Sequence, residues 1–269
     1  MDPLNPAIDW TRLGTEFRSA RPFHHVVIDD FFAPETARAL ADEYPAFDAP
    51  VWWRYDNPLE NKRACNDWNR FPPTTYRALA WLNSDVFVAR MSAVCGAPLF
   101  ADIGLNGGGW HCHGRGGKLN VHLDYSLHPK LALERRLNLI VYLSPGWDAA
   151  WGGGLGLWED DGGRPGRLGR RVDCLFNRAV LFDTTQNSWH GLPEPIECPE
   201  GRTRNSLAVY YLCEPRPDAS ERGKALYAPY GDQVDDPRVL ELIRLRADVA
   251  TAHRVWVSDT SLETGVSAP

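Results

Sequence analysis

The chain has 269 residues, of which 43% are hydrophobic and 24% are charged, a composition typical of a folded domain with a substantial core. Its formal net charge of -6 at pH 7 argues against nucleic acid as an electrostatic partner. The sequence has no positive N-terminal leader and no apolar stretch of about 20 residues, the length of a membrane span. We therefore expect a cytoplasmic protein that binds neither nucleic acid nor membrane.

The six cysteines are scattered along the chain and include no C-x-x-C pair. This spacing indicates neither a zinc knuckle nor a compact disulfide framework. We expect most of the thiols to be reduced and structural.

The N-terminal third, residues 1–106, is predicted to be a support region of one short strand and several helices. The strand is expected at residues 25–28. A helix is expected over residues 34–43, because proline is compatible with its first turn and apolar side chains recur at helical spacing. Another helix should begin after Ser84, a good N-cap, and end at Gly96. We expect these helices to pack against the core.

From about Leu119 the pattern changes to short strands separated by Gly, Pro and Asp turns. The clearest strands are expected at residues 136–143, 155–158, 179–183 and 206–213. Recurrent short strands with turn signals favour a sandwich or barrel of jelly-roll type, so the expected fold class is α+β. We assign the jelly-roll core to residues 107–214 of a single domain.

The C-terminal extension, residues 215–269, is polar at first and is predicted to be helical over residues 237–249. Two roles are open for this helix. It could cover one end of the barrel, or it could contribute to a homodimer contact.

His122 and Asp124 are the first metal-ligand candidates. Alternate residues of a strand point to the same face, so the two side chains can reach one ion. Val121 and Leu123 alternate with polar positions, which is the pattern of a half-buried strand. A histidine from a neighbouring strand would complete the two-histidine, one-carboxylate facial triad of non-haem Fe(II) oxygenases, which leaves coordination positions open. The alternative is a polar pair on the surface.

His190 is the candidate for the third ligand, although a histidine here could equally be a satisfied core residue. Arg204 favours the metal site. It begins a predicted strand on which it shares a face with Ser206. A buried guanidinium is costly unless it meets an anion, and its planar fork matches a carboxylate of a dicarboxylate such as 2-oxoglutarate. An ion pair with a protein acid, and Arg202 as the anchor, remain alternatives.

The order of motifs between about Gly107 and Leu212 resembles the Fe(II)/2-oxoglutarate-dependent dioxygenases of the prolyl 4-hydroxylase type. Their pattern is H-x-D, R-x-L-x-x-x-x-Y-L, W-x-x-x-x-G-G-x-L, a strand ending in Phe, H-G or H-x-V, and R-x-S. The resemblance implies a double-stranded β-helix core of jelly-roll, cupin-like type with flanking N-terminal and C-terminal helices. It also implies an Fe(II) site and a cosubstrate pocket, with residues as follows: iron ligands His122, Asp124 and His190, and 2-oxoglutarate contacts Arg204, Ser206 and Tyr142.

Two details refine the expected chemistry. Halogenating relatives have Gly or Ala in place of the metal-binding aspartate, so Asp124 favours hydroxylation. Gly154 occupies the position at which many relatives have the acidic residue of G-G-E-L, so the function of that carboxylate is absent here. Asn120 or Asn138 could orient the imidazoles, although each could equally be structural, and Asn120 is a candidate cofactor contact.

The substrate pocket is expected to involve side chains close in sequence to the ligands: Trp110, His111, His113, Arg115, Tyr125, His128 and Trp189. Glycines surround His111 and His113, so we expect a mobile loop there that contacts substrate or solvent.

The expected reaction hydroxylates an aliphatic C–H of a small molecule, an amino acid or a prolyl residue. It uses Fe(II), 2-oxoglutarate and O2, and it releases succinate and CO2. Two alternatives remain: oxidative cyclisation or desaturation at the same iron centre, and a jelly-roll binding or sensing protein that holds a metal without turnover.

Overall fold

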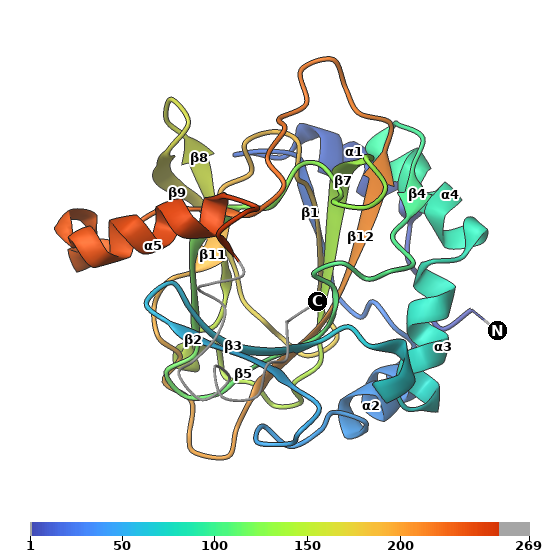
Figure 1. The fold of residues 1–269 in the computed structure, drawn as a ribbon. Helices are drawn as coiled ribbons and strands as arrows, with labels where there is room; N and C mark the ends of the chain where they lie inside the picture. The colour runs from blue at the N-terminus through green and yellow to red at the C-terminus, as the bar shows by residue number, and fades with distance from the viewer. Residues whose placement is uncertain (1, 253–269) are drawn as a thin grey trace.

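A strongly curved antiparallel sheet forms the centre of the computed structural model, which describes residues 2–252 (Figure 1). Its main path runs through β1 (His25–Ile28), β10 (Ala179–Asp183), β7 (Glu134–Tyr142), β12 (Arg204–Cys213), β5 (Gly109–His113), β3 (Glu60–Cys65), β6 (Lys118–Leu123), β11 (His190–Leu192), β8 (Leu155–Asp160) and β9 (Pro165–Val172). Three short strands pair outside this path: β2 (Trp53–Asn57) with β3, β4 (Phe100–Ala101) with β12, and β13 (Leu226–Tyr227) with β6. The sheet curls into a nearly closed barrel, which confirms the predicted double-stranded β-helix.

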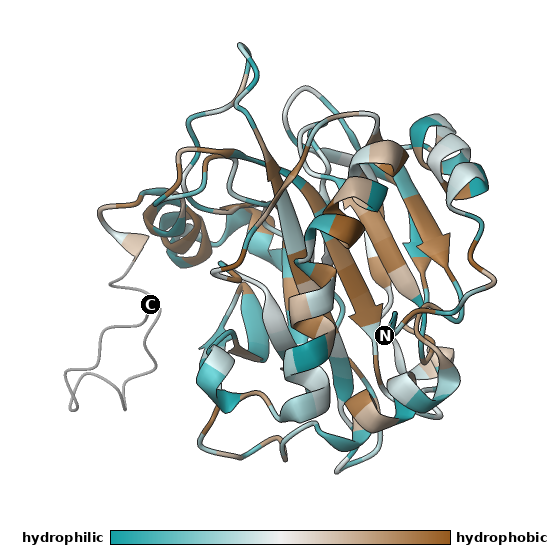
Figure 2. Cartoon of the chain, turned by 90° about the vertical axis from the view of Figure 1, so that its right-hand side faces the viewer, coloured by the Kyte–Doolittle hydropathy of each residue, from teal (hydrophilic) through white to brown (hydrophobic). Residues whose placement is uncertain are grey.

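Helices flank the barrel, as the predicted α+β class requires. One group covers an outer face of the sheet: α1 (Trp10–Ser19), α2 (Pro34–Asp42), α3 (Pro73–Leu82) and α4 (Asp85–Cys95). Figure 2 shows this layer in front of strongly apolar strands. The largest apolar cluster fills the space between them and includes Phe31, Leu40, Phe87, Leu139 and Leu181. A second cluster, which contains Leu157, Val180 and Phe182, lies on the inner side of the strands.

The local signals for two of these helices act as expected. Pro34 opens α2, where a missing N–H costs no intrahelical hydrogen bond. The Ser84 hydroxyl accepts a hydrogen bond from the Phe87 N–H at 3.4 Å and so caps α4. Gly96 ends α4 with φ +76°, a left-handed conformation that glycine adopts without steric cost.

Two helices and several strands are not predicted from the sequence. Helix α1 buries only Leu13, Gly14 and Phe17, so its apolar stripe is narrow. Helix α3 begins directly after Pro72, where consecutive prolines suggest a turn. Strand β9 is mostly exposed and rich in arginine, so it lacks the apolar alternation of a half-buried strand.

The prediction of a mobile loop around His111 and His113 is wrong. These residues lie on β5, which pairs with β12 on one side and β3 on the other. The glycines permit close packing: Gly109 has φ +81°, and a Cβ at this position would overlap the carbonyl of Cys65. Glycine here therefore marks a close approach of two backbones.

The C-terminal extension lies over one side of the barrel. Its helix α5 (Pro237–Ala247) contacts β13, which in turn pairs with β6. Val239 packs in a small cluster with Leu59 and Tyr227. This arrangement corresponds to the covering role. The homodimer contact stays a prediction, as does the division of one domain into regions 1–106, 107–214 and 215–269. Residues 253–269 lie outside the described part of the chain.

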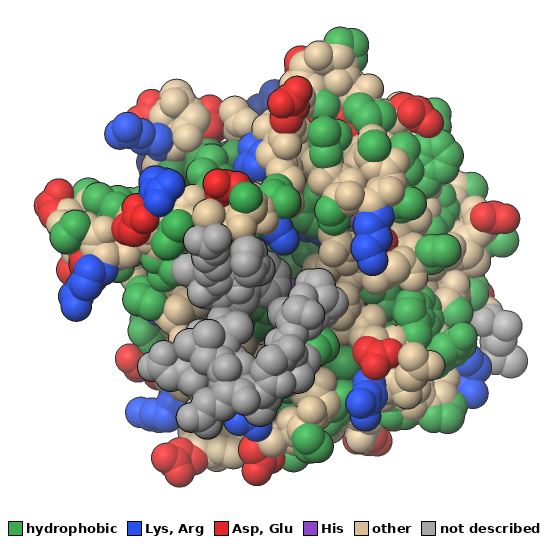
Figure 3. Space-filling view, viewed as in Figure 1, with side chains coloured by type: hydrophobic (Ala, Val, Ile, Leu, Met, Phe, Trp, Pro, Cys, Tyr) green, Lys and Arg blue, Asp and Glu red, His purple; other side chains and the backbone are tan. Residues whose placement is uncertain are grey.

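All six cysteines are buried free thiols, as expected. Within residues 2–252, no helix has the length and apolar character needed to cross a bilayer. On the face drawn in Figure 3, acidic and basic side chains are interspersed over the described surface, without one extended basic patch.

Candidate metal centre and cosubstrate pocket

Three potential ligands come together where β6 ends and β11 begins. His122 and His190 are directly opposite each other in the antiparallel pair, and Asp124 follows β6. The Nε2 atom of His122 lies 3.7 Å from Asp124 Oδ1, and that of His190 lies 3.8 Å from Asp124 Oδ2. All three side chains are buried, and their ligand atoms lie within 4.8 Å of one another. In residues 2–252, this is the one group of His, Cys, Asp and Glu with such spacing.

Backbone carbonyls orient both imidazoles. His122 Nδ1 lies 2.9 Å from the Asn120 carbonyl, and His190 Nδ1 lies 2.7 Å from the Ser188 carbonyl. Because a carbonyl only accepts, each Nδ1 carries the proton and each Nε2 presents a lone pair. Burial and the neighbouring His122 lower the pKa of His190 to about 4, so this ring is neutral at pH 7. Two imidazole nitrogens and a carboxylate fit a divalent iron ion.

The carboxylate of Asp124 is held ionised. Burial alone would raise its pKa, but the Arg135 guanidinium and the two histidines outweigh burial and hold the pKa of Asp124 well below its ordinary range. Arg135 Nη1 lies 3.3 Å from Asp124 Oδ1, and Asn138 Nδ2 donates to Oδ2 at 3.3 Å. The guanidinium carbon of Arg135 lies 3.4 Å and 3.5 Å from the ring centroids of Tyr125 and Tyr210.

A cavity of about 540 Å³ opens beside the three ligands. Strand register sets its floor: His113 is opposite Arg204, and Ser206 is opposite both His111 and Tyr142. Because side chains alternate along each strand, these residues point to one face of neighbouring strands. The floor therefore carries one buried cation, Arg204, surrounded by neutral hydrogen-bonding groups.

Arg204 faces this cavity and is only 3% exposed. Its Nε donates to the Gly153 carbonyl at 2.7 Å, its Nη1 lies 3.4 Å from Ser206 Oγ, and its guanidinium carbon lies 4.8 Å from the Tyr142 ring centroid. Burial raises the pKa of Tyr142 to about 12, so the phenol keeps its proton. No Asp or Glu among residues 2–252 forms an ion pair with Arg204, so the guanidinium can receive an exogenous carboxylate.

Neither alternative for the arginine fits the geometry: Arg202 as the anchor, or Arg204 in an ion pair with a protein acid. Arg202 lies at the surface, where its Nη2 donates to the Pro145 carbonyl at 2.6 Å. Glu194, a possible ion-pair partner of Arg204, instead lies 3.3 Å from Arg171. Arg204 alone of the two arginines points into the cavity.

The predicted substrate residues divide into two groups. His111, His113, Tyr125 and His128 line the cavity. Trp110 and Trp189 do not, which corrects the prediction: alternation on β5 turns Trp110 outward against Phe71, with ring centroids 5.0 Å apart, and Trp189 Nε1 donates to Asp160 at 2.8 Å. Arg115 is exposed and donates to the Cys198 carbonyl at 3.1 Å.

Asn120 also differs from its predicted role as a cofactor contact. Its side-chain amide donates to the Ala228 carbonyl at 3.1 Å and to Gln233 Oε1 at 2.6 Å, so it links β6 to the C-terminal extension. It serves His122 only through its backbone carbonyl. The asparagine that reaches the metal ligands with its side chain is Asn138.

His113 is the least satisfied side chain of the cavity. It is 2% exposed, and neither ring nitrogen has a hydrogen-bond partner among the described residues. Burial, Arg204 and Lys62 hold its pKa well below the ordinary histidine value, so the ring is neutral at pH 7. It offers a bound molecule one donor and one acceptor.

One wall of the cavity comes from residues that the motifs do not indicate. Tyr227, opposite His122 in the β13–β6 pair, stacks on the imidazole with ring centroids 5.2 Å apart. Its hydroxyl donates to Glu60 Oε2 at 3.2 Å, and Lys62 and Arg246 lie 3.1 Å and 2.6 Å from the same carboxylate. The polar alternation of Glu60 and Lys62 is the one local signal, and it predicts a strand without indicating its place in the site.

Comparison with known proteins concerns the same part of the chain. Residues 108–212 match the family model described as 2OG-Fe(II) oxygenase superfamily. Over 78 residues the chain is 32% identical to Prolyl 3-hydroxylase OGFOD1 from Xenopus laevis. This alignment covers 29% of the chain and 15% of that relative, so the chain spans only a small part of the curated relative's length.

Two solved structures have a similar fold. A prolyl hydroxylase from Trichoplax adhaerens, in complex with a hypoxia inducible factor peptide fragment, has a TM-score of 0.52 and 15% identity, covering 76% of this chain and 88% of that one. A Pseudomonas putida prolyl-4-hydroxylase has a TM-score of 0.52 and 18% identity, covering 75% and 99%. At these identities the likeness concerns the fold. Residues 108–212 are thus similar to the 2OG-Fe(II) oxygenase superfamily, and the barrel that contains them has the fold of the prolyl hydroxylases.

Proposed function

We propose that the protein is an Fe(II)- and 2-oxoglutarate-dependent dioxygenase that hydroxylates an aliphatic C–H bond. In this reaction substrate, O2 and 2-oxoglutarate give hydroxylated substrate, succinate and CO2. One observation carries the proposal: a two-histidine, one-carboxylate cluster and a buried arginine without an acidic partner in residues 2–252 line the same cavity. The match of residues 108–212 to the 2OG-Fe(II) oxygenase superfamily supports it.

In this proposal, His122, Asp124 and His190 hold the iron, and Arg204 receives the distal carboxylate of 2-oxoglutarate. Ser206 and the protonated Tyr142 lie beside that guanidinium and would fix the orientation of the carboxylate. When bound, the iron and 2-oxoglutarate supply the oxidising chemistry. The protein orients both molecules and excludes water, since the three ligands and Arg204 are all buried.

A cavity of about 540 Å³ is the size of a small-molecule site or of a pocket for one residue of a peptide. The substrate is accordingly a small molecule, an amino acid or a prolyl residue, and the prolyl hydroxylases among the relatives support the last choice. Tyr125, His128, His111 and His113 line the cavity and are the candidate contacts. Buried free thiols support a cytoplasmic location.

A non-catalytic binding protein is the second candidate, and Arg204 argues against it because a metal-binding module needs no cosubstrate anchor. Cyclisation and desaturation would use the same residues, so product analysis separates them from hydroxylation.

The direct test is succinate formation. Anaerobically purified protein would be given Fe(II), 2-oxoglutarate and oxygen, first alone and then with candidate substrates. We expect succinate from the wild type and none above background from Asp124→Ala. Arg204→Lys should weaken 2-oxoglutarate binding far more than iron binding, whereas the surface variant Arg202→Lys should change neither. Equal succinate from wild type and Asp124→Ala would exclude the oxygenase function.

A further inference from the structure

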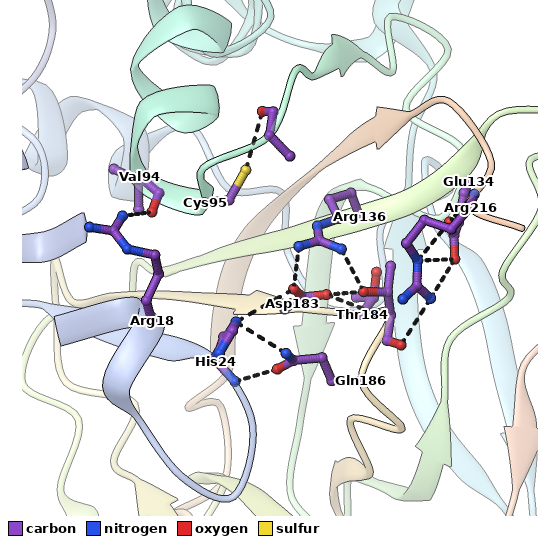
Figure 4. Close-up of polar contacts among 12 residues, drawn as sticks. Arg18, His24, Val94, Cys95, Glu134, Arg136, Asp183, Thr184, Gln186 and Arg216 are labelled. Carbon is purple, nitrogen blue, oxygen red and sulfur yellow. Dashed lines mark hydrogen bonds and ion pairs between the residues drawn. The ribbon is translucent and has the colours of Figure 1, made fainter. Parts of the chain in front are cut away.

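We propose that a buried polar cluster centred on Asp183 positions the distal ligand His190 from outside the barrel. The inference rests on the metal centre proposed above. Asp183 is a positioning residue in this scheme, because it touches neither the ligands nor the cavity. Its side chain alternates with that of Phe182, which packs inside the barrel, and so faces the helical layer, and Figure 4 shows it beside Arg136 and His24.

Asp183 is fully buried, and its carboxylate contacts the side chains of Arg136, His24 and Thr185. Its Oδ2 lies 3.1 Å from Arg136 Nη2 and 3.9 Å from His24 Nδ1. Its Oδ1 accepts hydrogen bonds from the Thr185 backbone N–H at 2.8 Å and from the Thr185 hydroxyl at 2.6 Å. Arg136 Nη1 donates to the same hydroxyl at 2.9 Å, which closes a ring of three side chains. One carboxylate thus holds Thr185, the second residue of the connection to β11, in place.

That connection, residues 184–189, is held along its length. Arg216 donates to the Thr185 carbonyl at 3.2 Å and pairs with the buried Glu134. The Gln186 side chain accepts from the His24 N–H at 2.8 Å. Near the end of the connection lies Ser188, whose carbonyl accepts the Nδ1 proton of His190. A shift at Thr185 would therefore move the carbonyl that sets the ring orientation of His190.

A second route leads from the cluster to Asp124. The Thr184 hydroxyl donates to the Arg135 carbonyl at 2.8 Å, and its N–H donates to the Arg136 carbonyl at 3.0 Å. Arg135 in turn lies 3.3 Å from Asp124. Residues 184–189 are therefore held in place next to His190 and next to Arg135, the ion-pair partner of Asp124.

The test uses Asp183→Asn in the full chain, with Co(II) as the probe metal. Asparagine preserves the shape and one acceptor but removes the charge that faces Arg136 and His24. We expect the Co(II) dissociation constant to rise about tenfold or more, the range found when groups that orient metal ligands are changed. The visible spectrum of bound Co(II) should change as well, since it reports ligand geometry.

Thr185 supplies an independent variant if Asp183→Asn fails to fold. Thr185→Val removes the hydroxyl bonded to Asp183 and Arg136 and should weaken Co(II) binding, whereas Thr185→Ser should restore it. Glu43→Gln is the stability control, because that carboxylate caps α3 through Thr74 and Thr75 and has no contact with the connection. It should lower the melting temperature without changing Co(II) affinity or spectrum.

Unchanged Co(II) affinity and spectrum in folded Asp183→Asn, or in Thr185→Val, would overturn the positioning role. The positioning role would also be overturned if Glu43→Gln lost Co(II) affinity in the same proportion to its fall in melting temperature. Absence of Co(II) binding by the wild type is a different result, because it would remove the metal centre itself.

Discussion

Arg135 and Arg204 are buried arginines that line the same cavity, and their surroundings differ. Arg135 lies 3.3 Å from Asp124 and between the rings of Tyr125 and Tyr210, so its charge is compensated within the protein. Arg204 has carbonyl and hydroxyl acceptors, but no carboxylate among the described residues pairs with it. Burial alone does not distinguish a structural cation from a ligand anchor. The presence or absence of an internal anion does.

Arg135→Met should have the largest effect. It leaves the buried Asp124 carboxylate without its cation, and breaking such a pair costs about 3–5 kcal/mol. We expect the free energy of unfolding of the metal-free protein to fall by about this amount in chemical denaturation. A loss below about 1 kcal/mol, the value of an exposed pair, would mean that Arg135 is not the main compensating charge.

The same pair predicts a pH dependence. Folding lowers the pKa of Asp124 below its ordinary value near 3.8, so the stabilisation is present above that value and is lost as pH falls through the folded-state pKa. Without Arg135, burial raises the pKa of Asp124 instead. The stability difference between wild type and Arg135→Met, measured without metal, should be largest near neutral pH. It should begin to shrink as the pH falls through the raised pKa of Asp124 in the variant, and it should shrink further as the pH approaches the folded-state pKa of the wild type. A difference that stays constant with pH would contradict this account.

Arg204→Met should act on ligand binding rather than on stability. Charge-assisted hydrogen bonds contribute about 1.5–3 kcal/mol each, so the 2-oxoglutarate dissociation constant should rise about 100-fold or more. The unfolding free energy of the ligand-free protein should not fall, since a buried charge without an internal anion is removed. Calorimetric titration with the metal-loaded protein measures the first quantity and denaturation the second. A large stability loss would reveal an undetected internal partner.

His113→Phe should give the smallest effect. The neutral imidazole has no partner among the described residues, so a phenyl ring should leave the ligand-free stability unchanged or slightly raised. If the ring bonds a cosubstrate carboxylate beside Arg204, 2-oxoglutarate affinity should fall about fivefold, the value of one hydrogen bond of about 1 kcal/mol. His111→Phe is the comparison, because His111 already bonds the Gly107 carbonyl at 3.1 Å. Unchanged affinity in His113→Phe would assign the ring to the substrate.

The residue patterns predict the barrel class, the ligand triplet and the arginine strand, because each depends on contacts within one strand or one motif. Spacing of i and i+2 places His122 and Asp124 on one face whatever surrounds them. Capping by Ser84 and termination by Gly96 are likewise local. The incorrect loop around His111 shows the limit of such patterns: glycines there serve packing between strands, which depends on partners distant in the sequence.

The sequence by itself determined which donor atoms are available and how they alternate along each strand, since backbone geometry sets side-chain direction within an element. Only the tertiary structure decided which of these atoms remain available to bind a metal ion or a ligand. Glu60 and Asp124 line one cavity, yet Lys62, Arg246 and Tyr227 bind the Glu60 carboxylate, whereas Asp124 faces two imidazole nitrogens. Trp110 and Trp189 lie close in sequence to the ligands but pack outside the cavity. Long-range strand pairing determines which carboxylates are compensated and which side chains are excluded from the cavity, because charge compensation and burial depend on elements that meet only when the barrel closes.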